Sequence, residues 1–235
     1  MAKSVADSGN PGVGIVGGTF DPIHIGHLRL GWEAKMQLNL AEVRFIPCHI
    51  PPHRDTPRSH SQDRLTMTRL ACDPVPGFNV DDWEINRNEP SYSVETLSHI
   101  RSQIGADTPL VFIMGMDAYC QFSHWHEWHQ ILNLAHLWVA HRPGSSTPGN
   151  ESEEFELLQA LHVESPKDLL KQPAGFIHVY NTTALDISAT QLRFDIERGQ
   201  DPRFLIPDSV WHYVREHNLY NMRKCKTTNF TPEQQ

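Results

Sequence analysis

The sequence predicts an α/β fold, with a doubly wound, mainly parallel sheet and helices on both of its faces. Short apolar runs of strand length alternate along the chain with segments that have helical spacing. Some of these runs, such as residues 110–114, are apolar at every position, which is typical of strands that are covered on both faces. The chain has 235 residues, 39% of them hydrophobic, and is therefore long enough for a sizeable core.

The elements follow one another in a regular order. Strands are expected at residues 12–16, 43–47, 78–85, 110–114, 135–140 and 176–179. Helices are expected at residues 28–36, 63–72, 93–103, 127–134, 153–161, 187–199 and 207–217. Ser93 is expected as the N-cap of the third helix, with Glu95 in its first turn.

One domain is expected to span residues 12–220. Residues 1–11 and 221–235 are polar and are expected to be flexible tails. Residues 144–150 are rich in Ser, Thr, Pro and Gly and indicate an exposed linker. We do not place a domain boundary there, because the strand at 176–179 still needs the same sheet.

Charge and cysteine content narrow the class of protein. A formal net charge of −8 argues against broad binding to nucleic acid or to a membrane surface, so an anionic ligand must be held by a local cluster of positive groups. No apolar run approaches ~20 residues and the N-terminus lacks a hydrophobic leader, so we expect a cytoplasmic protein. The four cysteines are scattered without a Cys-x-x-Cys pair, which fits reduced thiols.

Residues 17–27, with the sequence G-G-T-F-D-P-I-H-I-G-H, join the first expected strand to the first helix. The adjacent glycines leave the backbone open to a ligand, and the first turn of a helix offers unpaired N–H groups and the positive end of the dipole. His24 and His27 are three residues apart, so on a first helical turn they share a face and can direct two ring N–H donors at one anion. The segment is therefore interpreted as a phosphate-binding turn, and it is neither a Walker A sequence nor G-x-G-x-x-G.

A pair of histidines three residues apart can bind a metal ion instead of an anion. His126 and His129 are also three residues apart and lie close to His124, but no Cys, Asp or further ligand is spaced to complete a tetrahedral set. We therefore predict no protein-held metal ion.

The block in residues 19–27 resembles the T/S-F-D-P-x-H-x-G-H signature of the nucleotidyltransferase superfamily, and its spacing is complete. Residues 187–193 resemble the I-S-S/A-T-x-x-R signature of the same superfamily, with Ala189 in place of a second serine. The resemblance implies a Rossmann-like nucleotidyltransferase fold and an ATP site. The residues that it assigns to ATP are Gly18, Thr19, Phe20, His24, His27, Ile187, Ser188 and Arg193. An alternative for Ser188 is a capping box with Gln191, which would only stabilise the helix.

Three more blocks are similar to the bacterial-type nicotinate mononucleotide adenylyltransferase family. They are P-P-H-R at residues 51–54, P-S-Y-S at 90–93 followed by T-L at 96–97, and G-x-D at 115–117 with F-x-x-W at 122–125 and R-P-G at 142–144. The resemblance covers about residues 14–220. It implies that the mononucleotide is bound by His53, Arg54, Ser93, Asp117, Trp125 and Arg142. Cys48 stands where the family often has asparagine or alanine, and Ser93 where threonine is frequent.

The resemblance implies an enzyme that transfers an adenylyl group from ATP to nicotinate mononucleotide and releases pyrophosphate, with Mg²⁺ carried by the ATP. We expect direct in-line attack without a covalent enzyme intermediate, and we expect His24, His27 and Arg193 to stabilise the charge that develops. A phosphopantetheine or glycerol-phosphate nucleotidyltransferase and a non-catalytic nucleotide-binding protein are the alternatives. The sequence leaves open the oligomeric state and the extent of the preference for the acid over the amide mononucleotide.

Overall fold

A parallel sheet forms the centre of the protein. The computed structural model describes residues 11–51, 56–87, 89–141, 153–183 and 185–221. The sheet has six strands in the order β3-β2-β1-β4-β5-β6, and every neighbouring pair is parallel. The strands are β1 (Val13–Gly18), β2 (Glu42–Pro47), β3 (Phe78–Val80), β4 (Leu110–Gly115), β5 (His136–His141) and β6 (Ile177–Asn181).

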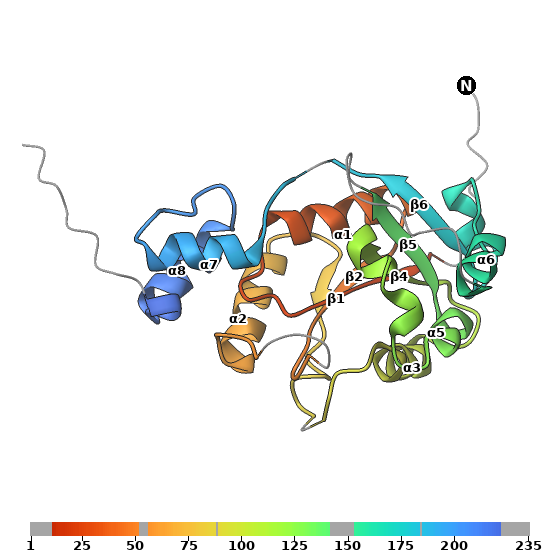
Figure 1. Ribbon diagram of the computed structural model, residues 1–235, viewed down its shortest axis with the longest axis horizontal. Coiled ribbons are helices and arrows are strands. Elements are labelled where there is room, and N and C mark those ends of the chain that lie inside the picture. The colour runs from red at the N-terminus through yellow and green to blue at the C-terminus, as the bar shows by residue number, and fades with distance from the viewer. Residues whose placement is uncertain (1–10, 52–55, 88, 142–152, 184, 222–235) are drawn as a thin grey trace, which may run out of the picture.

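Helices cover both faces of the sheet, as Figure 1 shows. One face packs against α1 (Ile25–Leu38) and α2 (Ser61–Cys72). The helices α7 (Ala189–Glu197) and α8 (Asp208–Glu216) extend the same core beyond the sheet, with α8 packed on α2. The other face packs against α3 (Ser93–Ile104), α5 (Trp128–Leu134) and α6 (Glu153–Ala160). Shorter helical segments are α4 (Met116–Tyr119), η1 (Phe122–His124), η2 (Pro166–Leu170) and η3 (Leu219–Asn221). The predicted doubly wound α/β fold is confirmed.

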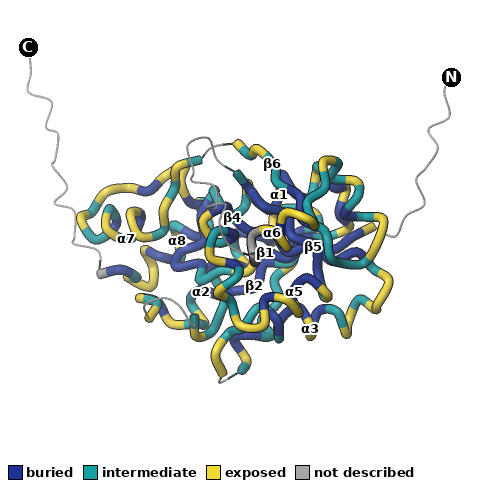
Figure 2. The backbone as a smooth tube through the Cα atoms, turned by 45° about the vertical axis from the view of Figure 1, so that its right-hand side comes forward, coloured by how far each residue is buried: buried dark blue, intermediate teal, exposed yellow. Residues whose placement is uncertain are grey.

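Alternate side chains of the strands enter two separate cores. In β4, Val111 and Ile113 belong to the core under α1 and α2, whereas Phe112 and Met114 belong to the core under α3 and α5. Both sets are buried, which explains why this strand is apolar at every position. Figure 2 shows the buried backbone concentrated in the central strands.

The third strand is shorter than predicted. The sequence predicts a strand over residues 78–85, but β3 ends at Val80. The side chain of Asp81 accepts a hydrogen bond from the N–H of Trp83 at 2.9 Å, which turns the chain away from the sheet. Glu84, which alternation assigned to the strand, lies in the following turn and is buried.

Two helix starts also differ from expectation. The N-cap of α3 is Tyr92, whose carbonyl accepts the N–H groups of Glu95 and Thr96, and Ser93 is the first helical residue. Ser188 is the N-cap of α7, but its hydroxyl makes no capping hydrogen bond, and Gln191 donates to Asp195 instead. The capping box is therefore not formed.

The strand order reverses between β1 and β4, because β1 has β2 on one side and β4 on the other. In open α/β sheets the crevice outside the carboxyl ends of the strands at such a reversal is where ligands bind. The segments that follow these two strands are residues 19–24 and α4. Among the helices that the structure describes, none has the length and apolar character that crossing a bilayer requires.

Candidate active site

The two histidines of the first signature lie face to face at the start of α1. His24 is the N-cap and is buried, and His27 occupies the first turn. Their rings stack with centroids 3.6 Å apart and an angle of 22° between the planes. The backbone N–H of His24 donates to Nδ1 of His27 at 3.3 Å, so a neutral His27 carries its proton on Nε2. The edge of the Phe20 ring packs on His27 with centroids 5.0 Å apart.

Two glycines of this turn are packed so closely that a side chain would not fit without movement. A Cβ at Gly26 would lie 3.0 Å from Nδ1 of His24. A Cβ at Gly18 would lie 2.7 Å from the ring of Phe20. The turn therefore places the histidine ring and the phenylalanine ring directly over bare backbone.

The second signature lies against the first. The same Cβ at Gly26 would lie 3.7 Å from Cβ of Ile187. Nη1 of Arg193 donates to the carbonyl of Asp21 at 2.7 Å, although the two residues are 172 positions apart. Nη2 of Arg193 donates to the hydroxyl of Thr190 at 3.2 Å, and its Nε is buried without an acceptor among the described residues. The structure thus brings together the two segments that the sequence assigns to ATP.

Asp21 organises this junction with its buried carboxylate. One carboxylate oxygen accepts the backbone N–H of Arg58, and the other accepts the hydroxyl of Tyr220, both at 2.8 Å. Burial, and then the Asp21 charge, raise the pKa of Tyr220 well above its usual range, so this hydroxyl stays a donor. The sequence analysis missed Tyr220, because nothing in its local pattern links it to residue 21.

Arg64 is a second residue that the sequence analysis missed. Arg64 is 1% exposed, and its guanidinium donates to the carbonyls of Thr19, Cys48 and His49 at 2.7, 2.6 and 3.1 Å. These carbonyls follow β1 and β2 directly, so one side chain fixes the carboxyl ends of both strands. Its position in the helix could have indicated that Arg64 is buried, because it lies three residues before the buried Met67 and therefore on the same helical face.

The residues predicted to bind the mononucleotide are described only in part. His53, Arg54 and Arg142 lie outside the described residues. Ser93 begins α3, and Asp117 is exposed in α4, directly after β4. Trp125 is half-buried, and its ring lies 6.1 Å from that of Phe112 in β4, edge to face.

The histidines around Trp125 make ring contacts. His126 packs on Tyr92 with centroids 4.5 Å apart, and His129 stacks on Trp128 at 3.6 Å. In the part of the chain that the structure describes, no group of three or more potential ligand side chains could hold a metal ion.

Comparison with known proteins identifies the family. The Cytidylyltransferase-like family model matches residues 15–194. A probable nicotinate-nucleotide adenylyltransferase of Cellvibrio japonicus (strain Ueda107) is 45% identical over 210 residues, covering 89% of this chain and 99% of that protein. A protein of the same description from Aeromonas salmonicida (strain A449) is 46% identical over 208 residues, covering 88% and 96%.

Solved structures show the same fold. That of Plasmodium falciparum nicotinic acid mononucleotide adenylyltransferase complexed with NaAD matches with a TM-score of 0.66 and 16% identity, over 91% of this chain and 98% of that one. Sequence identity and coverage together establish that this chain belongs to the nicotinate-nucleotide adenylyltransferase family.

Proposed function

We propose that the protein carries out its family's reaction, adenylyl transfer from ATP to nicotinate mononucleotide in NAD biosynthesis, by direct in-line attack. The mononucleotide phosphate attacks the α-phosphorus of ATP, the new phosphoanhydride bond forms as the bond to the β-phosphate breaks, and pyrophosphate leaves. A phosphate monoester has a second pKa of about 6 and is largely ionised at neutral pH, so no general base is required. The protein's contribution is alignment and charge stabilisation.

The meeting of the two signatures at the carboxyl end of β1 is the observation that carries this proposal. His24 and His27 stack at the start of α1, and Arg193 reaches from α7 to the carbonyl of Asp21. Two helix N-termini, two imidazoles and one guanidinium can share the negative charge that spreads over the phosphoryl oxygens in the transition state. Gly18, Thr19 and Phe20 supply the backbone against which the triphosphate lies.

Mg²⁺ fits this site as an ion that ATP carries. Both carboxylate oxygens of Asp21 already accept hydrogen bonds from Arg58 and Tyr220, so the acidic side chain of the first signature is engaged. Mg²⁺ keeps several waters and binds readily through substrate phosphates. When bound, the ion neutralises charge on the pyrophosphate leaving group.

Selectivity for the acid is assigned to the start of α3. No acceptor among the described residues pairs with the backbone N–H of Ser93 or Val94. These N–H groups, at the positive end of a helix of 12 residues, would receive the nicotinate carboxylate. The amide of nicotinamide mononucleotide would place a donor against donors, which leaves polar groups unpaired.

A coupled assay for pyrophosphate tests the reaction, with ATP and each mononucleotide in turn. We expect kcat/KM for nicotinate mononucleotide to exceed that for nicotinamide mononucleotide at least a hundredfold. Comparable values for the two would refute the backbone account. Release of pyrophosphate only with phosphopantetheine or glycerol phosphate would favour the alternative transferases, and none with any acceptor would favour a non-catalytic protein.

Two further measurements refine the mechanism. ATP that is chiral at the α-phosphorus should give a product with inverted configuration, and retention would indicate a covalent enzyme intermediate. Ser93→Pro removes one N–H at a helix position where proline is tolerated, so it should reduce the acid preference more than Ser93→Ala does.

A further inference from the structure

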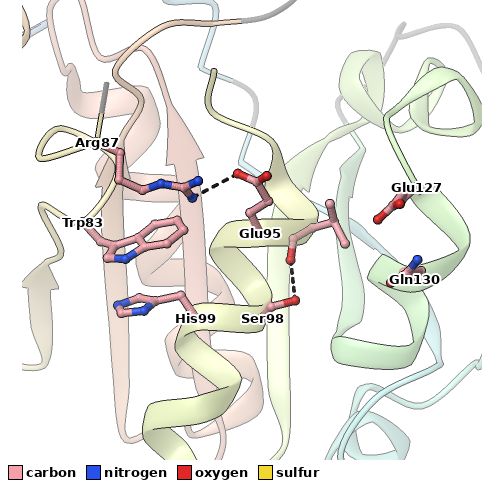
Figure 3. Close-up of a pocket in the computed structure, with 8 residues that line it drawn as sticks. Trp83, Arg87, Glu95, Ser98, His99, Glu127 and Gln130 are labelled. Carbon is pink, nitrogen blue, oxygen red and sulfur yellow. Dashed lines mark hydrogen bonds and ion pairs between the residues drawn. The ribbon is translucent and has the colours of Figure 1, made fainter. Parts of the chain in front are cut away.

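The turn that follows β3 lies along α3 and is held there on its exposed side by a stack of side chains (Figure 3). The indole of Trp83 stacks on His99 of α3, with centroids 4.4 Å apart and an angle of 11°. The guanidinium of Arg87 lies 4.2 Å from the centroid of the Trp83 indole and pairs with Glu95 of α3 at 3.0 Å. These residues line a groove of about 530 Å³ that contains none of the predicted site residues. The ring stack packs the turn against the helix, whereas the Arg87–Glu95 pair lies at the surface, where such pairs contribute little.

Glu84 lies on the inner side of the same turn and is 7% exposed. Its carboxylate accepts the hydroxyl of Thr96 at 2.5 Å and the hydroxyl of Ser91. Burial raises the pKa of Glu84, because these hydroxyls only partly compensate for the loss of hydration. A buried carboxylate is costly, and an apolar side chain of similar volume would avoid that cost. The contacts of Glu84 with Ser91 and Thr96 indicate a role other than stabilisation.

Ser91 connects Glu84 to the loop that follows β2. Its backbone N–H donates to the carbonyl of Ile50, and its hydroxyl oxygen accepts the N–H of His49, both at 3.0 Å. The Ser91 hydroxyl can donate to Glu84 while its oxygen accepts the N–H of His49, so one side chain can join the two. The carbonyl of His49 is in turn held by Arg64.

The same carboxylate orients the start of α3 through Thr96. The Thr96 hydroxyl has a second acceptor within reach, the carbonyl of Tyr92 at 3.3 Å, and its shorter bond is the one to Glu84. The carbonyl of Tyr92 thereby remains for the first backbone bonds of α3. Glu84 thus acts on both sides of Ser93, through Ser91 before it and Thr96 after it.

We propose that Glu84 is a positioning residue for the mononucleotide, because its hydrogen bonds to Ser91 and Thr96 set the direction of the N–H groups at the start of α3. This inference rests on the proposed function, in which those N–H groups receive the nicotinate carboxylate. Glu84 itself does not touch the substrate. A carboxylate accepts from two hydroxyls at once, whereas an amide offers one acceptor oxygen and one donor, so Glu84→Gln disturbs one of the two contacts while conserving shape.

The test compares Glu84→Gln and Ser91→Ala, alone and combined, with Glu95→Gln as the matched control. Glu95 lies on the same helix but pairs with Arg87 at the exposed side. For each variant, KM for both substrates, kcat, the ratio of acid to amide kcat/KM and the melting temperature are measured. We expect Glu84→Gln to raise KM for nicotinate mononucleotide about tenfold and to lower the acid-to-amide ratio about tenfold.

In Glu84→Gln, KM for ATP and kcat should stay within about twofold of wild type, and Glu95→Gln should change neither KM nor the ratio. The double variant Glu84→Gln/Ser91→Ala should lose less than the sum of the two single variants, because Ser91→Ala removes one of the two contacts through which Glu84 acts. Equal losses for both substrates, or a lower melting temperature with unchanged KM, would overturn the proposal in favour of a purely structural role. If Glu84→Gln does not fold, Ser91→Ala still tests the proposal. An unchanged ratio of acid to amide kcat/KM in that variant would by itself overturn it.

The wild-type protein separates failure of this inference from failure of the proposed function. A wild type that prefers the acid while Glu84→Gln keeps the same preference refutes only the role of Glu84. A wild type that uses neither mononucleotide, or both equally, refutes the proposed function and this inference with it.

Discussion

Two arginines bind backbone carbonyls at opposite edges of the sheet. Arg64 donates to the carbonyls that follow β1 and β2, at the carboxyl edge. Arg101 donates to the carbonyls of Thr108, Leu134 and Pro173, which precede β4, β5 and β6 at the amino edge. Across the residues that the structure describes, neither side chain forms an ion pair with a carboxylate. The same device therefore fixes loops at both edges.

The loops differ in what they carry. Those held by Arg64 include Thr19, which is assigned to ATP, and His49, which Ser91 links to the start of α3. The loops held by Arg101 contain none of the predicted site residues. The same kind of hydrogen bonding thus holds loops that carry predicted site residues at one edge and loops that carry none at the other.

Two histidines, His27 and His136, show the same difference between the carboxyl edge and the amino edge of the sheet. His27 stacks on His24 at the carboxyl edge, next to the bare backbone of Gly26. His136 at the amino edge is fully buried, and both of its ring nitrogens bond to backbone, with Nε2 at the carbonyl of Gln172 and Nδ1 at the N–H of Phe176. Substitutions at the two edges should therefore change different measured quantities.

The largest effect is expected for His27→Ala. Removal of the imidazole should lower kcat a hundredfold or more, on the order of 3 kcal/mol of transition-state stabilisation, while the melting temperature changes little. Steady-state kinetics and thermal unfolding measure the two quantities. His129→Ala, which removes an exposed histidine on α5, is the control and should retain wild-type kcat. An unchanged kcat in folded His27→Ala would remove this ring from the charge-stabilising set.

His136 should affect stability as a function of pH. Burial lowers the pKa of His136 from 6.5 to about 4, so the folded state disfavours the proton that the unfolded chain takes up. Protonation of His136 therefore does not change the free energy of unfolding above pH 6.5. That free energy falls by about 3 kcal/mol as the pH decreases from 6.5 to about 4.

Urea unfolding of wild type and His136→Gln between pH 7 and 4 measures this dependence. The free energy of unfolding of the variant should be lower at pH 7 and should fall less steeply with acid, while KM and kcat at pH 7 are retained. Parallel curves for the two proteins would show that another group dominates the acid dependence.

The two arginines give a paired prediction. Arg64→Met and Arg101→Met should each lower the free energy of unfolding by about 2 kcal/mol, because buried carbonyls lose their donor. Arg64→Met should also raise KM for both substrates about tenfold, whereas Arg101→Met should leave both within about twofold. Equal changes in KM for the two variants would contradict the functional difference between the edges.

The smallest effect is expected for Gly26→Ala. The added Cβ would lie 3.0 Å from the ring of His24, so the ring must shift by a few tenths of an ångström. Alanine has the higher helix propensity, so stability should be retained while kcat falls about tenfold, or about 1.4 kcal/mol. A kcat equal to wild type would show that the position of the His24 ring is not critical.

The sequence predicts the fold well because each strand has a local apolar pattern that can be recognised without knowing its neighbours. Residues 110–114 are apolar at every position, and β4 is buried on both faces. The errors arise where one side chain redirects the backbone, as Asp81 does at the end of β3. At α3 the expected cap was a side chain, whereas the carbonyl of Tyr92 accepts the first bonds of the helix.

The candidate site is only partly readable from sequence. The meeting of residues 17–27 with residues 187–193 was predicted, and their roles with ATP remain predictions. Arg64, Glu84 and Tyr220 were not found, because each acts through a partner that is distant in sequence or through a backbone carbonyl. Such partners leave no spacing pattern, since any residue type supplies a carbonyl.

The hydrogen bond between Tyr220 and Asp21 joins residues that are 199 positions apart, and it sets an order of events during synthesis. At 5 to 20 residues per second, the ribosome adds Tyr220 roughly 10 to 40 s after Asp21. Throughout that interval the carboxylate of Asp21 lacks this partner, and Arg193 is also missing for most of it. A nascent chain therefore cannot join the two segments that are predicted to bind ATP until it is nearly complete.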